Sequence, residues 1–173
     1  MTRRQRLRRV GILCCHCLHN LAFYKAGWRD GVPKAKKQFW VNANGNFLDI
    51  AVLEWCKLFA DTRGKHFWRK LISDPPCFWA GLLGALEMDD AQFDDYVNQM
   101  RTYRDKFVAH LDSEETMHIP QLQGAIDSSA YLYDHLLAHE EVDGCFHDAP
   151  RNATDFYARF RDEGEALYEE IKT

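Results

Sequence analysis

An arginine and a histidine on one predicted helix are the residues of this chain best suited to chemistry. Apolar side chains recur there at steps of three or four, the spacing of one helical face, at Phe93, Tyr96, Val97, Met100, Phe107 and Leu111. Arg104 falls on this face, and His110 stands near its end. Because arginine is rarely buried without a partner, Arg104 should either pair with an internal carboxylate, such as Glu54, or line a cleft or subunit interface. In a cleft, a permanently charged donor beside a histidine that titrates near neutrality would be a catalytic arrangement.

The spacing of Arg104 and His110 limits how they can meet. On a straight α-helix, residues six positions apart are separated by about 120° around the axis and about 9 Å along it. The two side chains would then not share a face, unless His110 lies at or beyond the helix end. A two-fold homodimer through this helix would instead bring two copies of each residue into one cleft, because such an interface places every residue opposite its copy.

The segment from Arg104 to His110, with Tyr103 before it and Ala-His-Leu-Asp at its end, resembles the signature of the HEPN superfamily and its abortive-infection domains. In that signature an arginine is followed by a polar residue and, a few positions later, by a histidine. Arg104 and His110 match the arginine and the histidine, and Asp105 matches the polar position. Lys106 and Asp112 are supporting candidates because they adjoin the motif. The first third of the chain carries no motif that matches the family.

The resemblance implies a helical bundle that dimerises through the motif helices and cleaves RNA without a metal ion or other cofactor. Many members are toxins or phage-defence effectors, so a cognate antitoxin is an implied partner. In such a reaction the 2′-hydroxyl of the RNA is the nucleophile, and His110 would transfer the proton. Arg104 would stabilise the charge on the phosphate oxygens, and Asp112 would orient His110. The products would be a 2′,3′-cyclic phosphate and a 5′-hydroxyl.

Two other functions fit the residues. The same bundle, without catalysis, would bind RNA, a nucleotide or a partner protein. Alternatively, the chain would bind zinc through four side chains near one helix end: His135, His139, Cys145 and His147. The first two are four positions apart, on one helical face, as in many metal sites. A helix end also favours histidines through its dipole, which needs no metal.

The charge distribution and the cysteine content bear on RNA binding and on the cellular compartment. Basic residues predominate up to about residue 110 and acidic residues follow, for a net charge of −4. The basic part begins with a cluster that would contact RNA phosphates or simply be a solvated first turn: Arg3, Arg4, Arg6, Arg8 and Arg9. The six cysteines form no even framework, which favours a reducing, cytoplasmic compartment. Cys14 and Cys17 fall on an apolar stripe and are expected in the core.

The elements that would position the motif are predicted to be helical. Residues 1–173 are expected to form one all-α domain, an up-and-down bundle of about five main helices. The helices are predicted near 4–25, 47–60, 77–86 and 91–109, then from Pro120 and from Thr154, with a short helical piece at 66–72. Asn44 to Asn46, Asp89 and Thr154 are the expected capping signals. The longest apolar run, residues 77–86, is too short for a bilayer, which needs about 20 residues, so no membrane partner is expected.

Overall fold

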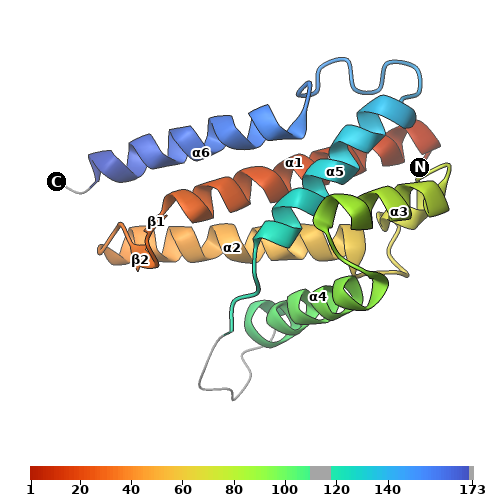
Figure 1. Cartoon of the computed structure of the whole chain (residues 1–173). Helices are drawn as coiled ribbons and strands as arrows, with labels where there is room; N and C mark the ends of the chain where they lie inside the picture. Colours follow the sequence, from red (N-terminus) through yellow and green to blue (C-terminus); the bar gives the residue numbers. More distant parts are fainter. Residues whose placement is uncertain (110–117, 172–173) are drawn as a thin grey trace.

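The computed structural model describes residues 1–109 and 118–171, which form an all-α helical bundle (Figure 1). Its six α-helices are α1 Arg3–Ala26, α2 Gln38–Phe59, α3 Pro75–Leu86, α4 Asp90–Tyr103, α5 Gln123–His139 and α6 Ala153–Glu170. A 3-10 helix (η1, Trp68–Lys70) precedes α3, and a π-helix (η2, Arg104–Ala109) continues α4. Within the described residues, none of the helices combines the length and the apolarity needed to cross a membrane.

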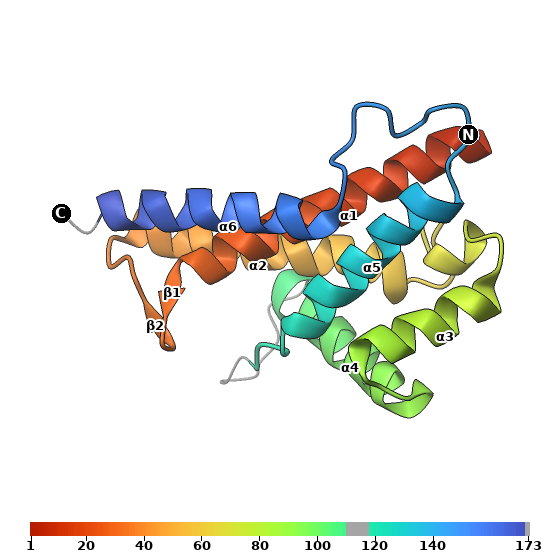
Figure 2. The ribbon, with the colours of Figure 1, turned by 45° about the horizontal axis from the view of Figure 1, so that its top comes forward.

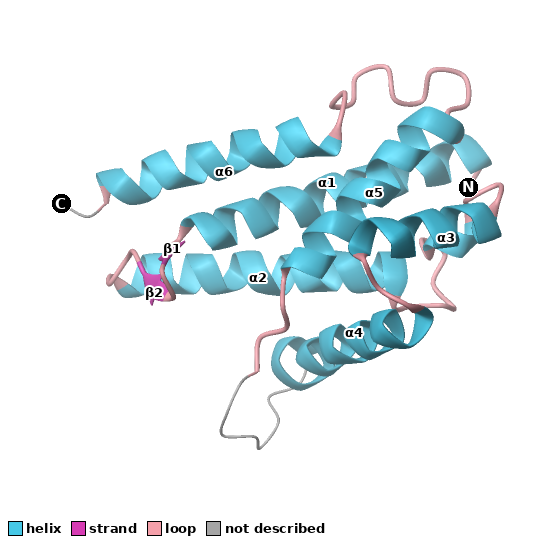
Figure 3. Ribbon diagram, viewed as in Figure 1, coloured by secondary structure: helices cyan, strands magenta, loops and turns pink. Residues whose placement is uncertain are grey.

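Helix α1 is the centre of the bundle. It packs against α2, α5 and α6, and Figure 1 shows it lying between α2 and α6. A short antiparallel hairpin, β1 Trp28–Arg29 and β2 Val32–Pro33, turns the chain from α1 back into α2 (Figure 3). Helix α5 crosses α1 obliquely in both ribbon views, α3 packs on α5, and α4 packs on α2 (Figure 2). The predicted helical bundle is therefore confirmed.

The core forms because the apolar stripes of these helices face one another. Cys14 and Cys17 are fully buried on α1, as predicted. The ring of Trp55 on α2 stacks on Phe59 at 5.2 Å between centroids, and its indole nitrogen donates to Ser128 Oγ at 2.8 Å. This bond satisfies a buried polar group inside the apolar core.

Three predicted helix starts are wrong. Helix α2 begins at Gln38 and not at Phe47, so Asn44 lies inside the helix and does not cap it. The last helix is capped by Asn152, whose side chain accepts from the backbone nitrogen of Asp155, and not by Thr154. Helix α5 begins at Gln123, after Pro120. For α6 a neighbouring residue, Asn152, takes the capping position, and for α2 the tertiary contacts of Asn44 hold it inside the helix.

Helix α4 begins where its capping signal predicts. Asp89 accepts from the backbone of Gln92, and the Gln92 side chain accepts in return from the backbone of Asp89, which is a capping box. The predicted α-helix to Ala109, however, is α-helical only to Tyr103. The motif therefore starts at the first residue of the π-helix, a form that is often found at functional sites.

Candidate functional site

Arg104 lies at the junction of α4 and η2 and is held by two carboxylates. Its Nη1 donates to Asp61 Oδ1 at 2.6 Å, just beyond the end of α2, and its Nε donates to Asp105 Oδ1 at 2.8 Å. The side chain is 18% exposed. An internal carboxylate partner was one predicted outcome, but the partner is Asp61. Glu54 pairs instead with Lys57 at 3.0 Å.

These contacts keep the arginine charged and leave one of its nitrogens available. Burial alone would lower the pKa of Arg104, but the hydrogen bonds to Asp105 and Asp61 outweigh burial and raise it. Among the described residues, no acceptor is bonded to Nη2 of Arg104, and this nitrogen is not among the buried unpaired atoms. Arg104 is thus a fixed cation that can still donate to an anion.

The same turn is tied to α2 on both sides of Arg104. Arg101 donates to the backbone oxygen of Ala60 at 2.7 Å, at the C-terminal end of α2. The hydroxyl of Tyr103 donates to Asp49 Oδ1 at 2.9 Å, further back along α2. Burial raises the pKa of Tyr103, and the neighbouring Asp49 adds to this effect. The start of η2 therefore presents a charged side toward Asp61 and an aromatic side toward Asp49.

The remaining motif residues divide into described and undescribed ones. Asp105 is half-exposed, and Lys106 is partly buried. His110 and Asp112 lie outside the described residues. Residues 104–109 form a π-helix, which closes its hydrogen bonds five residues apart instead of four. Because His110 is not among the described residues, the separation expected for Arg104 and His110 stays a prediction.

The N-terminal arginines do not form one free basic cluster. Arg3 donates to Glu140, to Ser73 Oγ at 3.1 Å and to the backbone oxygen of Leu71 at 2.9 Å. Arg8 binds both oxygens of Asp148 at 2.7 Å. These two side chains therefore connect α1 to the segments around it, and the predicted contact of the cluster with RNA stays a prediction.

The other three arginines of the cluster differ among themselves. Arg4 and Arg9 are exposed, as an RNA contact would require. Arg6 is partly buried, and its Nε has no partner among the described residues. Arg4 and Arg9 are thus the exposed arginines of the cluster that pair with no carboxylate of the described residues.

The four candidate zinc ligands are all described, but they do not come together. His135 and His139 are neighbours, with ring centroids 4.7 Å apart, and His135 faces Glu140 at 3.8 Å. Cys145 is buried, whereas His147 is 70% exposed and bonds within its own turn, to the backbone oxygen of Gly144 at 3.0 Å. No three His, Cys, Asp or Glu side chains in the described part of the chain are placed to hold a metal ion. The predicted four-ligand site is therefore not formed.

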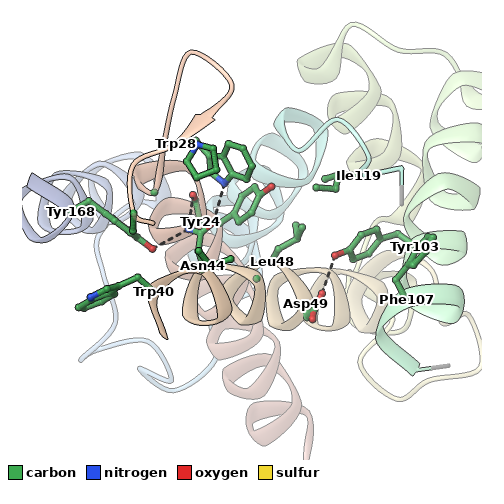
Figure 4. A pocket seen from close by; sticks show the side chains of 15 residues that line it. Tyr24, Trp28, Trp40, Asn44, Leu48, Asp49, Tyr103, Phe107, Ile119 and Tyr168 are labelled. Carbon is green, nitrogen blue, oxygen red and sulfur yellow. Dashed lines mark hydrogen bonds between the residues drawn. The ribbon is translucent and has the colours of Figure 1, made fainter. Parts of the chain in front are cut away.

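A pocket beside the motif was not predicted. It lies between the hairpin, α2, the end of α6 and the start of η2 (Figure 4). Its aromatic lining residues are Tyr24, Trp28, Trp40, Tyr103, Phe107 and Tyr168. Each lies on a different element (α1, β1, α2, α4, η2 and α6), so no local sequence pattern could have shown that they meet. Trp40 lies close to the basic residues 34–37, and aromatic side chains beside basic residues can stack on RNA bases.

Comparison with protein-family models, with curated proteins and with solved structures finds no match for this chain. The resemblance to the HEPN superfamily therefore rests on the residues of the motif and stays a prediction.

Proposed function

We propose that this chain is a metal-independent endoribonuclease of a toxin or phage-defence (abortive-infection) type. It would act as a homodimer through the segment from Arg104 to His110, with each copy contributing residues to a shared site. A toxin of this kind would be held in check by a cognate antitoxin. The free thiols of all six cysteines support a reducing, cytoplasmic setting.

The observation that carries this proposal is the state of Arg104. Two carboxylates hold its guanidinium in place through Nε and Nη1, and Nη2 is left unpaired by the described residues. A side chain that is already oriented loses little freedom when it meets an anion, so its hydrogen bond to a phosphate oxygen is more effective. Planar, always-charged arginine suits this task better than lysine.

The proposed reaction uses few protein groups. The 2′-hydroxyl of the RNA attacks the adjoining phosphorus, and the bond to the 5′-oxygen of the next nucleotide breaks. His110 would take the proton of the 2′-hydroxyl or give one to the leaving oxygen, and its copy in the dimer would do the other. Arg104 would stabilise the negative charge that gathers on the phosphate oxygens. Asp61 and Asp105 act through Arg104 and are positioning residues.

The test is RNA cleavage by purified protein in the presence of EDTA. Wild type is expected to cleave and to leave 2′,3′-cyclic phosphate ends, while His110→Ala, still folded and dimeric, should lose at least about a hundredfold in rate, the usual scale for a general acid or base. His147→Ala is the matched control, because His147 is an exposed histidine that bonds only within its own turn. Full activity in His110→Ala, or cleavage that stops in EDTA, would overturn the proposed mechanism.

A non-catalytic bundle that binds RNA is the second candidate, and the ion pairs of Arg104 favour it. Both carboxylates already neutralise the guanidinium, so a phosphate must compete with them. Under this alternative, folded wild type and His110→Ala would bind RNA equally and neither would cleave it.

A further inference from the structure

The pocket of Figure 4 has the dimensions and the walls of a site for one flat ring system. Its volume is about 290 Å³, at the lower end of the range of about 300–1,000 Å³ that is usual for small-ligand sites. Tyr24 and Trp28 stand on one side, with ring centroids 5.9 Å apart, and Trp40 and Tyr168 lie 6.1 Å apart on another. Aromatic side chains in such an arrangement can stack on a planar ligand.

A buried asparagine fixes these walls before any ligand arrives. Asn44 Oδ1 accepts from the indole nitrogen of Trp28 at 2.9 Å, and Asn44 Nδ2 donates to the hydroxyl of Tyr168 at 3.1 Å and to the backbone oxygen of Tyr24 at 3.0 Å. The asparagine is 9% exposed, and both hydrogens of its amide nitrogen are donated to Tyr24 and Tyr168. It therefore holds the rings in place and does not itself read a ligand.

Two other polar groups of the pocket keep unused hydrogen-bonding capacity. Asp49 accepts the hydroxyl proton of Tyr103 through Oδ1, and its second oxygen has no partner among the described residues. The hydroxyl of Tyr24 is likewise unpaired by that part of the chain, and Figure 4 draws it turned into the pocket, toward Ile119. Burial raises the pKa of Asp49, although the bond from Tyr103 opposes this. A carboxylate acceptor inside an aromatic pocket suits a ring that carries an amino group.

A second hollow, which shares Pro33 with this pocket, is lined by basic residues and by Asp30. Lys36 and Lys37 are exposed there, just before α2, and pair with no carboxylate of the described residues. Arg29 and Lys34 line the same hollow, but both face Glu169, at 2.6 and 4.0 Å. Phe39, in the first turn of α2, is 72% exposed and lies edge-on to Trp40. Sites for single-stranded RNA combine two components: basic side chains that bind the phosphates and aromatic rings that stack on the bases. Both components are present here.

We propose that this pocket holds one unpaired base of an RNA strand, a base with an exocyclic amino group. The base would lie among the rings that Asn44 fixes, its amino group would donate to Asp49, and Lys36 and Lys37 would bind the adjoining phosphates. The inference rests on the proposed function only in that RNA is the ligand. Because Tyr103 and Phe107 line the pocket and flank Arg104 in the sequence, a base held there would bring its strand beside the motif.

A glycine allows the pocket to be blocked without damaging the fold. Gly45 lies in α2 and lines the pocket, and a Cβ at this position would meet nothing within 4 Å. Gly45→Leu would place a side chain in the opening while replacing a helix-weakening glycine. Gly84, in α3, is equally open and does not line the pocket. Gly84→Leu is therefore the matched control.

The experiment measures binding of a single-stranded RNA that contains 2-aminopurine and 2′-fluoro sugars, which cannot be cleaved through a 2′-hydroxyl. Wild type and Gly84→Leu should bind it equally and quench the 2-aminopurine fluorescence through stacking. Gly45→Leu should bind about tenfold more weakly or worse, the scale of losing one stacked base, and should not quench. Asp49→Asn, which offers an amide donor where Asp49 has its second oxygen, should lower the preference for oligo(A) over oligo(U).

Several results would overturn the base-binding inference while leaving the nuclease proposal standing. Wild-type affinity and quenching in Gly45→Leu would show that no base enters the pocket. An unchanged base preference in Asp49→Asn would show that Asp49 does not recognise the amino group of the base. If adenosine monophosphate binds as tightly as the oligonucleotide, the occupant of the pocket is a free nucleotide and not a base of an RNA strand. Conversely, quenching that Gly45→Leu abolishes, in a protein that cleaves no RNA, would support the inference and refute only the nuclease activity. A folded wild type that neither binds nor cleaves RNA would refute both.

Discussion

Replacing Glu140 with alanine is expected to destabilise the fold strongly. The Glu140 side chain is 1% exposed. It accepts hydrogen bonds from Arg3, from the backbone nitrogen of Ser73 at 2.6 Å and from Ser73 Oγ at 2.8 Å. Removing one partner of a buried ion pair costs about 3–5 kcal/mol. Because Arg3 is 42% exposed and can regain water, we expect the lower part of that range, about 3–4 kcal/mol, which includes the unpaired Ser73 nitrogen.

The loss of stability in Glu140→Ala can be measured by urea denaturation and by thermal unfolding. For a chain of this size each kcal/mol shifts the midpoint temperature by about 2–4 °C, so Glu140→Ala should melt about 6–16 °C below wild type. Glu141→Ala is the matched control, because Glu141 is an exposed neighbouring carboxylate and its removal should change stability by less than about 0.5 kcal/mol.

The pH dependence gives a second check. Burial raises the pKa of Glu140, but the hydrogen bonds from Ser73 and Arg3 outweigh burial and lower it below that of the unfolded chain. The stabilisation is therefore present above the unfolded pKa of about 4.3 and is lost as the pH falls through the folded pKa. The difference between wild type and Glu140→Ala should shrink in acid. Two results would refute a buried ion pair at Glu140: a loss of stability under about 1 kcal/mol at neutral pH, or a stability difference between wild type and Glu140→Ala that does not shrink in acid. Arg3 would then be available for RNA.

Three further outcomes are expected. Gly27→Ala should lower the free energy of unfolding by about 1–3 kcal/mol, because a Cβ there would lie 2.3 Å from Asn44 Nδ2; unchanged urea denaturation would contradict the close packing behind the pocket. Replacing both Lys36 and Lys37 with alanine should make the salt dependence of RNA affinity shallower, by about 0.7 in the log–log slope for each lost phosphate contact. An unchanged slope would place both lysines outside the RNA interface. One thiol, Cys77, should react rapidly with Ellman's reagent, since the other five cysteines are at least partly buried; a fast phase that persists in Cys77→Ser would show that another thiol is accessible.

Local signals predicted several features correctly. Asp89 marks the start of α4 because its side chain reaches a backbone nitrogen only three residues away. Cys14 and Cys17 lie in the core because their spacing puts them on the apolar side of α1. Such effects act within one or two turns of the chain, and a sequence pattern contains them completely.

The start of α2 shows where local reasoning stops. Asn44 and the glycine after it have low helix propensity and suggest a cap, yet both lie inside α2. The asparagine is stable there because its amide bonds to Trp28, Tyr24 and Tyr168, two of which precede α2 while the third belongs to α6. The free energy of these contacts exceeds the propensity cost, which is under about 1 kcal/mol per residue.

Local sequence patterns predict the helical class, the amphipathic faces and the position of a charged motif near the end of one helix. They also leave Arg104 two alternatives, an internal carboxylate partner or a place in a cleft or subunit interface, because arginine is rarely buried without a partner. The packing of the helices, in contrast, selects the partner of Arg104 and pairs Arg3 with Glu140. Asp61 is 43 positions from Arg104, and Glu140 is 137 positions from Arg3. Pairs so distant, like the rings of the pocket, are brought together by the packing of whole helices, which depends on every face of the bundle at once.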